Sequence, residues 1–313
     1  MQENPMNSFQ WQTSNSISVL VGGILIALTV TTVQAQTIIL RGDQPEAVQA
    51  DLPNQISIDY VVPTKPEFQE LYSHLRNRRA LEKIQEILSP IRFSEQVIIK
   101  TAECGAVNSY YQRQDFKPTV TICYELLKHI LDSLPNETTP AGVTPDDATV
   151  GQFLWVTLHE VGHATFDIFG VPIFGREEDA ADNFATFIML QFGGGQARRL
   201  IGGAAWAWRS YLGDYRRNPV VQTRLAAFSS DHGQPQERFY NLLCLAFGAN
   251  KVEFADAESF LPPTRAPSCS YEYRTLVRAF HKEISPHVDQ DMAKQVLGTD
   301  WLPDPDTKPV PQR

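Results

Sequence analysis

The spacing of hydrophobic residues divides the chain into a first part with strand-like alternation and a second part with helical periodicity. In the first part, short apolar runs are bounded by proline or polar residues. They predict three strands, at 56–62, 97–102 and 120–123. Helical spacing recurs from 66 to 88, where Ser89 and Pro90 stop it, and again from 125 to 134. The pattern therefore predicts a small sheet with helices in its connections.

A long helix with the clearest start signal in the chain opens the second part. Thr144 is a good N-cap residue, Pro145 is favoured at the first helical position, and two acidic residues follow in the first turn. Gly170 favours a left-handed cap at the other end, so the helix is expected to span 145–169. Further helices are expected at 176–192, 198–215 and 236–247. Because the strand signals stop before Thr144, the expected fold is α+β, with a small sheet followed by a mainly helical half.

One long apolar segment lies near the N-terminus, from 17 to 33. Ala35 follows it, a small residue of the kind found before a signal-peptidase site, but no Lys or Arg precedes it. Residues 1–35 are therefore interpreted as a cleaved signal peptide or as an uncleaved membrane anchor, since about 17 apolar residues is the lower limit for a span. Either interpretation implies export. Residues 36–54 are expected to be a linker, 55–300 the globular domain and 301–313 a disordered tail.

Composition and charge narrow the possible partners. Of 313 residues, 42% are hydrophobic and 20% are charged, which suits a packed globular protein rather than a fibrous or disordered one. The formal net charge is −9, and the 27 basic residues form no block that could follow a phosphate backbone. We therefore expect no nucleic-acid partner.

Four cysteines lie beyond the N-terminal apolar segment, and an even number in an exported chain favours disulfides. Of the three possible pairings we prefer the one that closes short loops, Cys104–Cys123 and Cys244–Cys269. Each such loop would stabilise the fold by about 3 kcal/mol through the entropy of the unfolded chain. No two cysteines have C-x-x-C spacing, so a cysteine zinc site is not expected.

The helix expected at 145–169 contains His159-Glu160-Val161-Gly162-His163, the H-E-x-x-H pattern. Residues four apart lie on one helical face, so both imidazoles can reach a single ion while Glu160 faces a water on that ion. The surrounding helix is largely apolar, and polar side chains on a buried helix need partners, which a metal supplies. We therefore expect His159 and His163 to bind Zn²⁺ and Glu160 to act as the catalytic general base.

Two histidines leave zinc one protein ligand short of its usual catalytic set. Four carboxylates follow in the next expected helix, within the segment EEDAAD at 177–182. Glu178 and Asp182 are four residues apart and therefore share a face of that helix. An acidic helix start is also favoured without any metal. The third ligand is expected here, with Glu178 and its neighbour Glu177 as candidates.

With this Glu/Asp pair the sequence resembles the gluzincins, the HExxH metallopeptidases whose third ligand is a Glu followed four residues later by an Asp. The resemblance implies a zincin-like fold, Glu178 as the metal ligand, and Asp182 as the acceptor of a ligand histidine N–H. It also implies a His or Tyr that stabilises the oxyanion. His232 is the candidate for this catalytic role and Tyr240 is the weaker one. The other histidines are expected to be structural: His74, His129, His281 and His287.

A longer resemblance runs from about 56 to 280, to a group of bacterial exported metallopeptidases classed as a domain of unknown function. Only HExxH and the Glu/Asp pair are specific for a mechanism, and the other shared segments mark membership of the group. These segments are Glu103-Cys104-Gly105, Asn108 with Tyr110-Tyr111, Ile122-Cys123-Tyr124-Glu125, Asp231-His232, Arg238-Phe239-Tyr240-Asn241 and Cys244.

Together these features indicate an exported zinc-dependent metallopeptidase that hydrolyses a peptide or protein substrate with a zinc-activated water. The edge strand of the sheet, near 108–111 or 120–123, is expected to pair with an extended peptide. One alternative is an exported zinc-binding protein without turnover, against which Glu160 argues because a carboxylate beside the metal water has little structural use. Another is a zinc amidase that acts on a non-peptide amide of the cell wall. A membrane partner is expected only if residues 1–35 stay uncleaved.

Overall fold

The computed structural model describes residues 53–139, 142–217 and 231–302, all within one compact unit of the chain. The expected signal peptide or anchor at 1–35, all but the end of the expected linker, and the tail beyond Leu302 lie outside these ranges. Leu302 itself is buried against the core. In the part of the chain that the structure describes, no helix has the length and apolar character needed to cross a membrane.

Four strands form a single mixed sheet in the order β1-β2-β4-β3. The three expected strands run parallel to one another, and the fourth runs antiparallel at the edge. The strands are β1 (Ile56–Tyr60), β2 (Val97–Ala102), β3 (Ser109–Gln114) and β4 (Lys117–Cys123). The sequence of β3, SYYQRQ, gives a weak strand signal because the strand is only partly buried. Of the two segments expected at the edge, 108–111 is therefore right, and 120–123 is wrong because β3 covers it.

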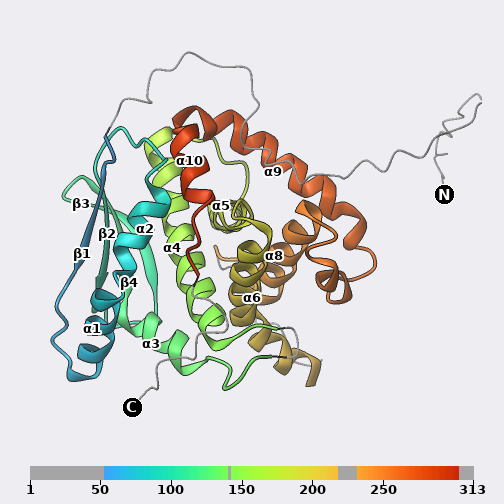
Figure 1. Cartoon of the computed structure of the whole chain (residues 1–313), viewed down its shortest axis with the longest axis horizontal. Helices are drawn as coiled ribbons and strands as arrows, with labels where there is room; N and C mark the ends of the chain where they lie inside the picture. The colour runs from blue at the N-terminus through green and yellow to red at the C-terminus, as the bar shows by residue number, and fades with distance from the viewer. Residues whose placement is uncertain (1–52, 140–141, 218–230, 303–313) are drawn as a thin grey trace, which may run out of the picture. The chain divides into compact units, whose positions relative to one another are not determined.

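The helix α4 (Pro145–Phe169) lies between the sheet and the other long helices (Figure 1). It contacts β3 and β4 on one side and α5 (Glu177–Leu190) and α6 (Gly194–Arg217) on the other. Its ends are those that the sequence predicts. Thr144 and Asp147 form a reciprocal capping box, and Gly170 adopts the left-handed conformation with a φ of 63°.

A close crossing fixes α6 against the start of α4. A Cβ atom at Gly203 would lie 1.9 Å from the backbone oxygen of Asp147, so only glycine allows the two backbones to approach this far. Arg199 then pairs with Asp147 across the same crossing, with 2.7 Å between Nε and Oδ1. The sequence pattern placed the start of α6 at 198, but the helix already begins within the glycine run at 193–195.

The single helix expected at 66–88 is wrong. A short 3-10 turn (Pro66–Phe68) leads into α1 (Gln69–Asn77), and Arg79 then adopts a left-handed φ of 53° before α2 (Ala80–Leu88). The hydroxyl of Tyr60, on β1, accepts the backbone N–H of Leu81 and donates to Glu82. This contact from the sheet satisfies the start of α2. After β4, α3 (Tyr124–Asp132) follows much as expected.

The C-terminal helices return to the first half of the chain. They are α8 (Pro235–Ala249), α9 (Cys269–Glu283) and α10 (Gln290–Leu297), with 3-10 turns at Ala255–Ser259, Ala266–Ser268 and Ser285–His287. Of the three helices, only α8 was expected from the hydrophobic pattern. The guanidinium of Arg92 pairs with Asp289 at 2.6 Å, and its backbone N–H donates to the carbonyl of His287. The end of the domain is thereby attached beside the sheet.

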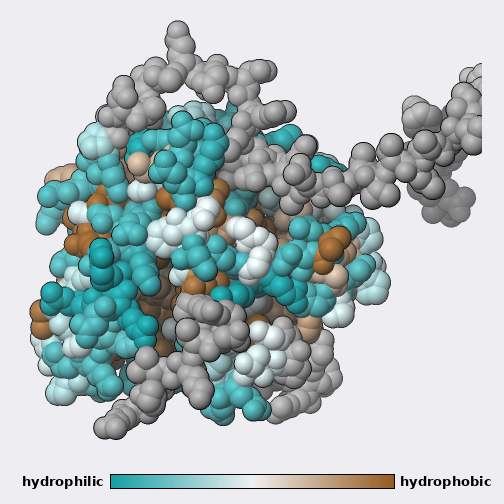
Figure 2. All heavy atoms as spheres, in the orientation of Figure 1, coloured by the Kyte–Doolittle hydropathy of each residue, from teal (hydrophilic) through white to brown (hydrophobic). Residues whose placement is uncertain are grey.

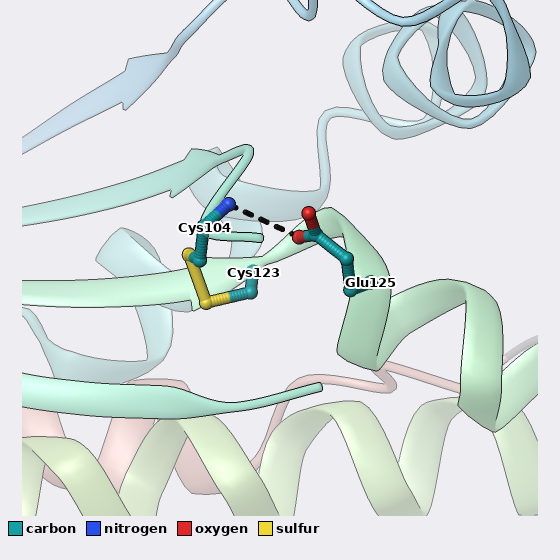
Figure 3. A group of neighbouring side chains, drawn as sticks. All are labelled: Cys104, Cys123 and Glu125. Atoms are coloured by element: carbon teal, nitrogen blue, oxygen red, sulfur yellow. Dashed lines mark hydrogen bonds between the residues drawn. A yellow bond between two sulfur atoms is a disulfide. The ribbon is translucent and has the colours of Figure 1, made fainter. Parts of the chain in front are cut away.

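Both disulfides have the pairing preferred from loop lengths, which confirms Cys104–Cys123 and Cys244–Cys269. The first joins the loop after β2 to the end of β4. Glu125 supports this loop by accepting the backbone N–H of Cys104, as Figure 3 shows, and also that of Gly105. The second joins α8 to the first residue of α9, where a loop was expected.

The surface agrees with the composition. Figure 2 shows mainly hydrophilic side chains over the described part of one face, with hydrophobic residues in small groups between them. A chain with a net charge of −9 is expected to present such a surface to water.

His287 should make the stability of the fold depend on pH. Its ring stacks on Phe169 with centroids 3.9 Å apart, and burial lowers the pKa of His287 below its usual value. The unfolded chain takes up this proton near pH ~6.5 whereas the folded chain resists it, so stability present above that pH is lost as the pH falls. His287→Phe keeps an aromatic ring but cannot bind the proton. Urea unfolding at about pH 7.5 and 5 should show a smaller loss of stability in the variant. Equal losses in the two proteins would contradict this role.

Candidate metal centre

The helix α4 presents His159 and His163 on one face, one turn apart, with ring centroids 5.0 Å from each other. His159 and Glu160 are only 4% and 6% exposed, because this part of α4 is covered on both sides. Imidazole and carboxylate groups at such depth need polar partners. Those partners come from α5 and from β3, and the ring of His232, just before α8, stacks on that of His159.

Glu178, in the first turn of α5, brings a third donor atom to the two histidines. Its Oε2 lies 3.0 Å from His159 Nε2 and 3.6 Å from His163 Nε2, and the two nitrogens are 3.3 Å apart. Ligand atoms that bind zinc tetrahedrally at about 2.0–2.1 Å are separated from one another by about 3.3 Å. The donor triangle, formed by these three atoms, therefore fits a zinc ion, and His₂Glu is a known ligand set of catalytic zinc.

Gly162, inside the HExxH segment, allows α5 to come this close. A Cβ atom at Gly162 would lie 3.3 Å from the Cα of Ala181 and from the ring of Phe184. A larger side chain at this position would push α5 away from α4 and widen the donor triangle. Glycine at this position therefore serves the packing that brings Glu178 to the histidines.

A second carboxylate holds each of the two histidines at its other ring nitrogen. Asp182 Oδ1 lies 2.8 Å from His159 Nδ1, and Glu177 Oε1 lies 2.8 Å from His163 Nδ1. Such contacts fix the tautomer and turn the Nε2 atoms toward the donor triangle. Glu177, the other candidate for third ligand, thus lies on the far side of the His163 ring, and Glu178 carries the oxygen between the Nε2 atoms.

Glu160 stands beside the donor triangle without contributing to it. The hydroxyl of Ser109 donates to Glu160 Oε1 over 2.8 Å. Ser109 is the first residue of β3, so the edge strand contacts the expected general base. Sequence reasoning missed Ser109, although it adjoins Asn108 in a segment shared with the resembling group.

His232, which precedes α8, also reaches the site. Its Nε2 lies 2.9 Å from Glu178 Oε2, its Nδ1 lies 3.0 Å from Asp231 Oδ1, and its ring stacks on that of His159. The two carboxylates contact opposite ring nitrogens, so this group forms a hydrogen-bonded row rather than a second donor triangle. Tyr240 packs against Phe239, and no hydrogen bond recorded among the described residues joins Tyr240 to the cluster.

Arg238, on α8, is the charged residue that completes the cluster. Its Nε and Nη2 lie 2.7 and 2.6 Å from the two carboxylate oxygens of Asp182. Its guanidinium lies over the rings of Trp155 and Trp208. From the sequence, Arg238 is noticed only as part of a segment shared with the resembling group. Its role could not be predicted because it depends on how α8 packs against α5.

The electrostatics of the cluster favour positive charge at its centre. Burial by itself lowers the pKa of His163, but hydrogen bonds to Glu178 and Glu177 outweigh it and raise the pKa to about 9. The pKa of His159 is raised in the same way, against burial, by Asp182 and Glu178. Hydrogen bonds from three imidazoles hold the pKa of Glu178 far below its usual value despite its burial. A divalent cation meets the same demand for charge, and it displaces protons when it binds.

A separate group of potential ligand atoms, Cys104, Cys123 and Glu125, is not a candidate metal centre. The two sulfur atoms are bonded to each other, and the Glu125 carboxylate is engaged by backbone N–H groups (Figure 3). Among the described residues, the remaining group of this kind is Glu178, Asp231 and His232, which shares Glu178 with the donor triangle.

Comparison with known proteins agrees with this chemistry. A family model described as "Putative metallopeptidase" matches residues 60–283, which is more than half of the chain and contains every residue of the cluster. No curated protein and no solved structure matches the chain at a significant level.

Proposed function

The chain belongs to this family of metallopeptidases, and from that premise we propose that it is an exported, zinc-dependent peptidase of the gluzincin type. The observation that carries the proposal is the donor triangle of His159, His163 and Glu178, with edges of 3.0 to 3.6 Å, next to Glu160. A zincin-like fold belongs to the same proposal. It is supported by the mixed sheet with an antiparallel edge strand that precedes the HExxH helix.

In this mechanism His159, His163 and Glu178 hold the ion, and Glu160 moves the protons. An ion held there would supply Lewis-acid chemistry, which would lower the pKa of a bound water and polarise the scissile carbonyl. Glu160 accepts the proton of the attacking water and gives it to the leaving amine. The Ser109 hydroxyl donates to Oε1 of Glu160, and among the described residues no hydrogen bond engages Oε2, so we assign this proton to Oε2.

We propose His232 as the donor to the oxyanion that forms at the scissile carbonyl. Asp231 engages Nδ1, so Nε2 carries the proton that His232 donates, and in this structure that N–H lies 2.9 Å from Glu178 Oε2. Once Glu178 holds the ion, the same N–H would turn to the oxyanion. A developing negative charge beside Glu178 lies within reach of this N–H, and such donors stabilise the transition state. Tyr240 is the weaker candidate because its contact is with Phe239.

The substrate class in this proposal is a peptide or protein, and nucleic acid is not a partner. Among the described strands, β3 pairs only with β4, so the other edge of β3 can pair with an extended peptide. Because β3 begins at Ser109, a peptide on that edge passes Glu160. Backbone pairing would hold the peptide while the side chains near the metal set specificity.

Export is part of the proposal, through residues 1–35 as a cleaved signal peptide or a membrane anchor. The two disulfides support an oxidising compartment, since such bonds are rare in the cytosol. Membrane association would require that this segment stays uncleaved.

Metal analysis together with digestion of a peptide library tests the proposal. The purified protein should hold one zinc ion per chain and should cleave peptides, with loss of cleavage on chelation and recovery on addition of zinc. Tight zinc binding without cleavage of any peptide would favour a zinc-binding protein without turnover. Cleavage restricted to cell-wall amides would favour an amidase. A protein that binds no metal at all would contradict the mechanism.

Ser109→Ala should slow hydrolysis without loss of zinc. A hydrogen bond to a charged group is worth about 1.5–3 kcal/mol, so the loss of this orienting contact should reduce kcat by about 10-fold or more. Ser109→Thr keeps the hydroxyl and serves as the matched control. Steady-state kinetics and zinc content decide the question, and an unchanged kcat in Ser109→Ala would remove Ser109 from the mechanism.

A further inference from the structure

We propose that Arg238 is a positioning residue for the metal centre, which holds Asp182 in one orientation and thereby fixes the ring of His159. The inference rests on the proposed function, because it concerns the same metal centre. It assigns a role to a residue that lies two contacts away from the ligand His159 and takes no part in the chemistry.

A continuous row of short hydrogen bonds connects Arg238 on α8 to His159, the proposed metal ligand on α4. Arg238 donates from Nε to Asp182 Oδ2 over 2.7 Å and from Nη2 to Asp182 Oδ1 over 2.6 Å. Asp182 Oδ1 in turn lies 2.8 Å from His159 Nδ1. A carboxylate held at both oxygens by a planar guanidinium has a single orientation. The direction of the His159 ring follows from that orientation.

Burial explains why Asp182 needs this partner. The side chains of Asp182 and Arg238 are only 12% and 11% exposed, so neither charge is well solvated. A buried carboxylate without a paired charge is costly and tends to move toward water or change its contacts. The imidazole of His159 offers one hydrogen bond to it, whereas Arg238 offers two and a full positive charge.

Two indole rings hold the guanidinium in place. It lies 4.8 Å from the ring centroid of Trp155 and 4.3 Å from that of Trp208, and the two indoles meet edge to face. Trp155 also stacks on His159, with centroids 5.5 Å apart. The same indole therefore packs against both ends of the hydrogen-bonded row. Cation–π contacts of this kind are strongest where water is excluded.

The measurable consequence is a dependence of zinc affinity on Arg238. Changes in the partner of a ligand histidine typically cost 10- to 100-fold in metal affinity. Arg238→Met, which fills similar space without charge, should weaken zinc binding by about 10-fold in a chelator competition. Arg238→Lys keeps the charge but loses the fork, so it should weaken binding less. It is also the variant to measure if Arg238→Met does not fold.

A double-mutant cycle with Asp182→Asn tests whether Arg238 acts through Asp182. If it does, the two losses are not additive, and Arg238→Met should change zinc affinity by less than about 2-fold once Asp182 is Asn. Additive losses would show that Arg238 affects the site by another route and would overturn the proposal.

Arg199→Met is the matched control for general destabilisation. Arg199 also pairs with a buried aspartate, Asp147, but at the other end of α4. The twelve residues between Asp147 and His159 correspond to about 18 Å of helix. This variant should lose stability with zinc affinity unchanged. An equal loss of zinc affinity in Arg199→Met would overturn the proposal.

A second readout separates this inference from the peptidase function. The Nδ1–H proton of His159, identified by its loss in Asp182→Asn, should exchange slowly in NMR spectra of the metal-free wild type. It should also persist in Arg199→Met but exchange rapidly in Arg238→Met. A wild type that binds zinc but cleaves nothing would refute the peptidase function and leave this result standing. Unchanged exchange and zinc affinity in Arg238→Met would refute the positioning role alone.

Discussion

Glu160→Gln is expected to abolish hydrolysis while zinc content and thermal stability stay close to those of the wild type. Removal of a general base typically costs about 10² to 10⁴-fold in rate, and Gln has no basic oxygen to accept the proton of water. The donor triangle does not include Glu160, so the ion should remain bound. The amide of Gln keeps the shape of the side chain, and its oxygen can still accept the hydroxyl of Ser109 at this buried position.

Single-turnover or steady-state rates on a cleaved library peptide, with zinc content from elemental analysis, measure this effect. Glu177→Gln is the matched control, because it changes a second glutamate of the same cluster, whose hydrogen bond among the described residues goes to the far nitrogen of His163. At saturating zinc it should keep the rate within about 10-fold of the wild type. Full activity in Glu160→Gln would mean that the general-base mechanism is wrong.

His163→Ala should lose metal and stability together. It removes one of three atoms of the donor triangle, so the ion keeps only His159 and Glu178. A ligand that binds only the folded state at 100 times its Kd stabilises a protein by about 2.7 kcal/mol, and the variant forfeits this contribution. Its melting temperature should fall to that of wild type treated with a chelator, or below it. The lost contacts of His163 with Glu177 and Glu178 add to the effect.

Thermal melts with and without chelator, together with zinc content after dialysis, test this expectation. His74→Ala is the control, because His74 is exposed on α1 and belongs to no metal-ligand group found among the described residues. It should leave zinc content and melting temperature unchanged. Equimolar zinc retained by His163→Ala at wild-type affinity would exclude His163 as a ligand.

The sequence alone predicted those features that depend on neighbouring residues. The ends of α4 follow from the Thr144 cap and from Gly170, and both signals act within one turn of the helix. The shared face of His159 and His163 follows from helical spacing once α4 is recognised. The two disulfides close short loops, so loop length was enough to select their pairing.

The errors in the fold arose where distant segments decide the local structure. The continuous helical spacing at 66–88 gave no sign of the break at Arg79, because the contact that starts α2 comes from Tyr60 on another element. The strand β3 has few buried positions, so its hydrogen bonds to β4 define it better than its sequence does. The position of α10 depends on the pair formed by Arg92 and Asp289, which are 197 residues apart.

The candidate site likewise combines features that the sequence predicted with features that only the tertiary structure decided. Sequence spacing placed two imidazoles and Glu160 on α4, and the resemblance to the gluzincins favoured Glu178 over Glu177 as the third ligand. The two glutamates lie about 100° apart around α5, so the direction of each depends on how that helix packs. The packing of α5 on Gly162 brings Glu178 to the Nε2 atoms and leaves Glu177 at the far side of His163. Ser109 and Arg238 come from β3 and α8, so only the assembled fold brings them to the cluster. Helix caps and helical periodicity involve residues a few positions apart, so the sequence alone predicts them. Contacts between elements depend on how the whole core packs, so only the tertiary structure decides them.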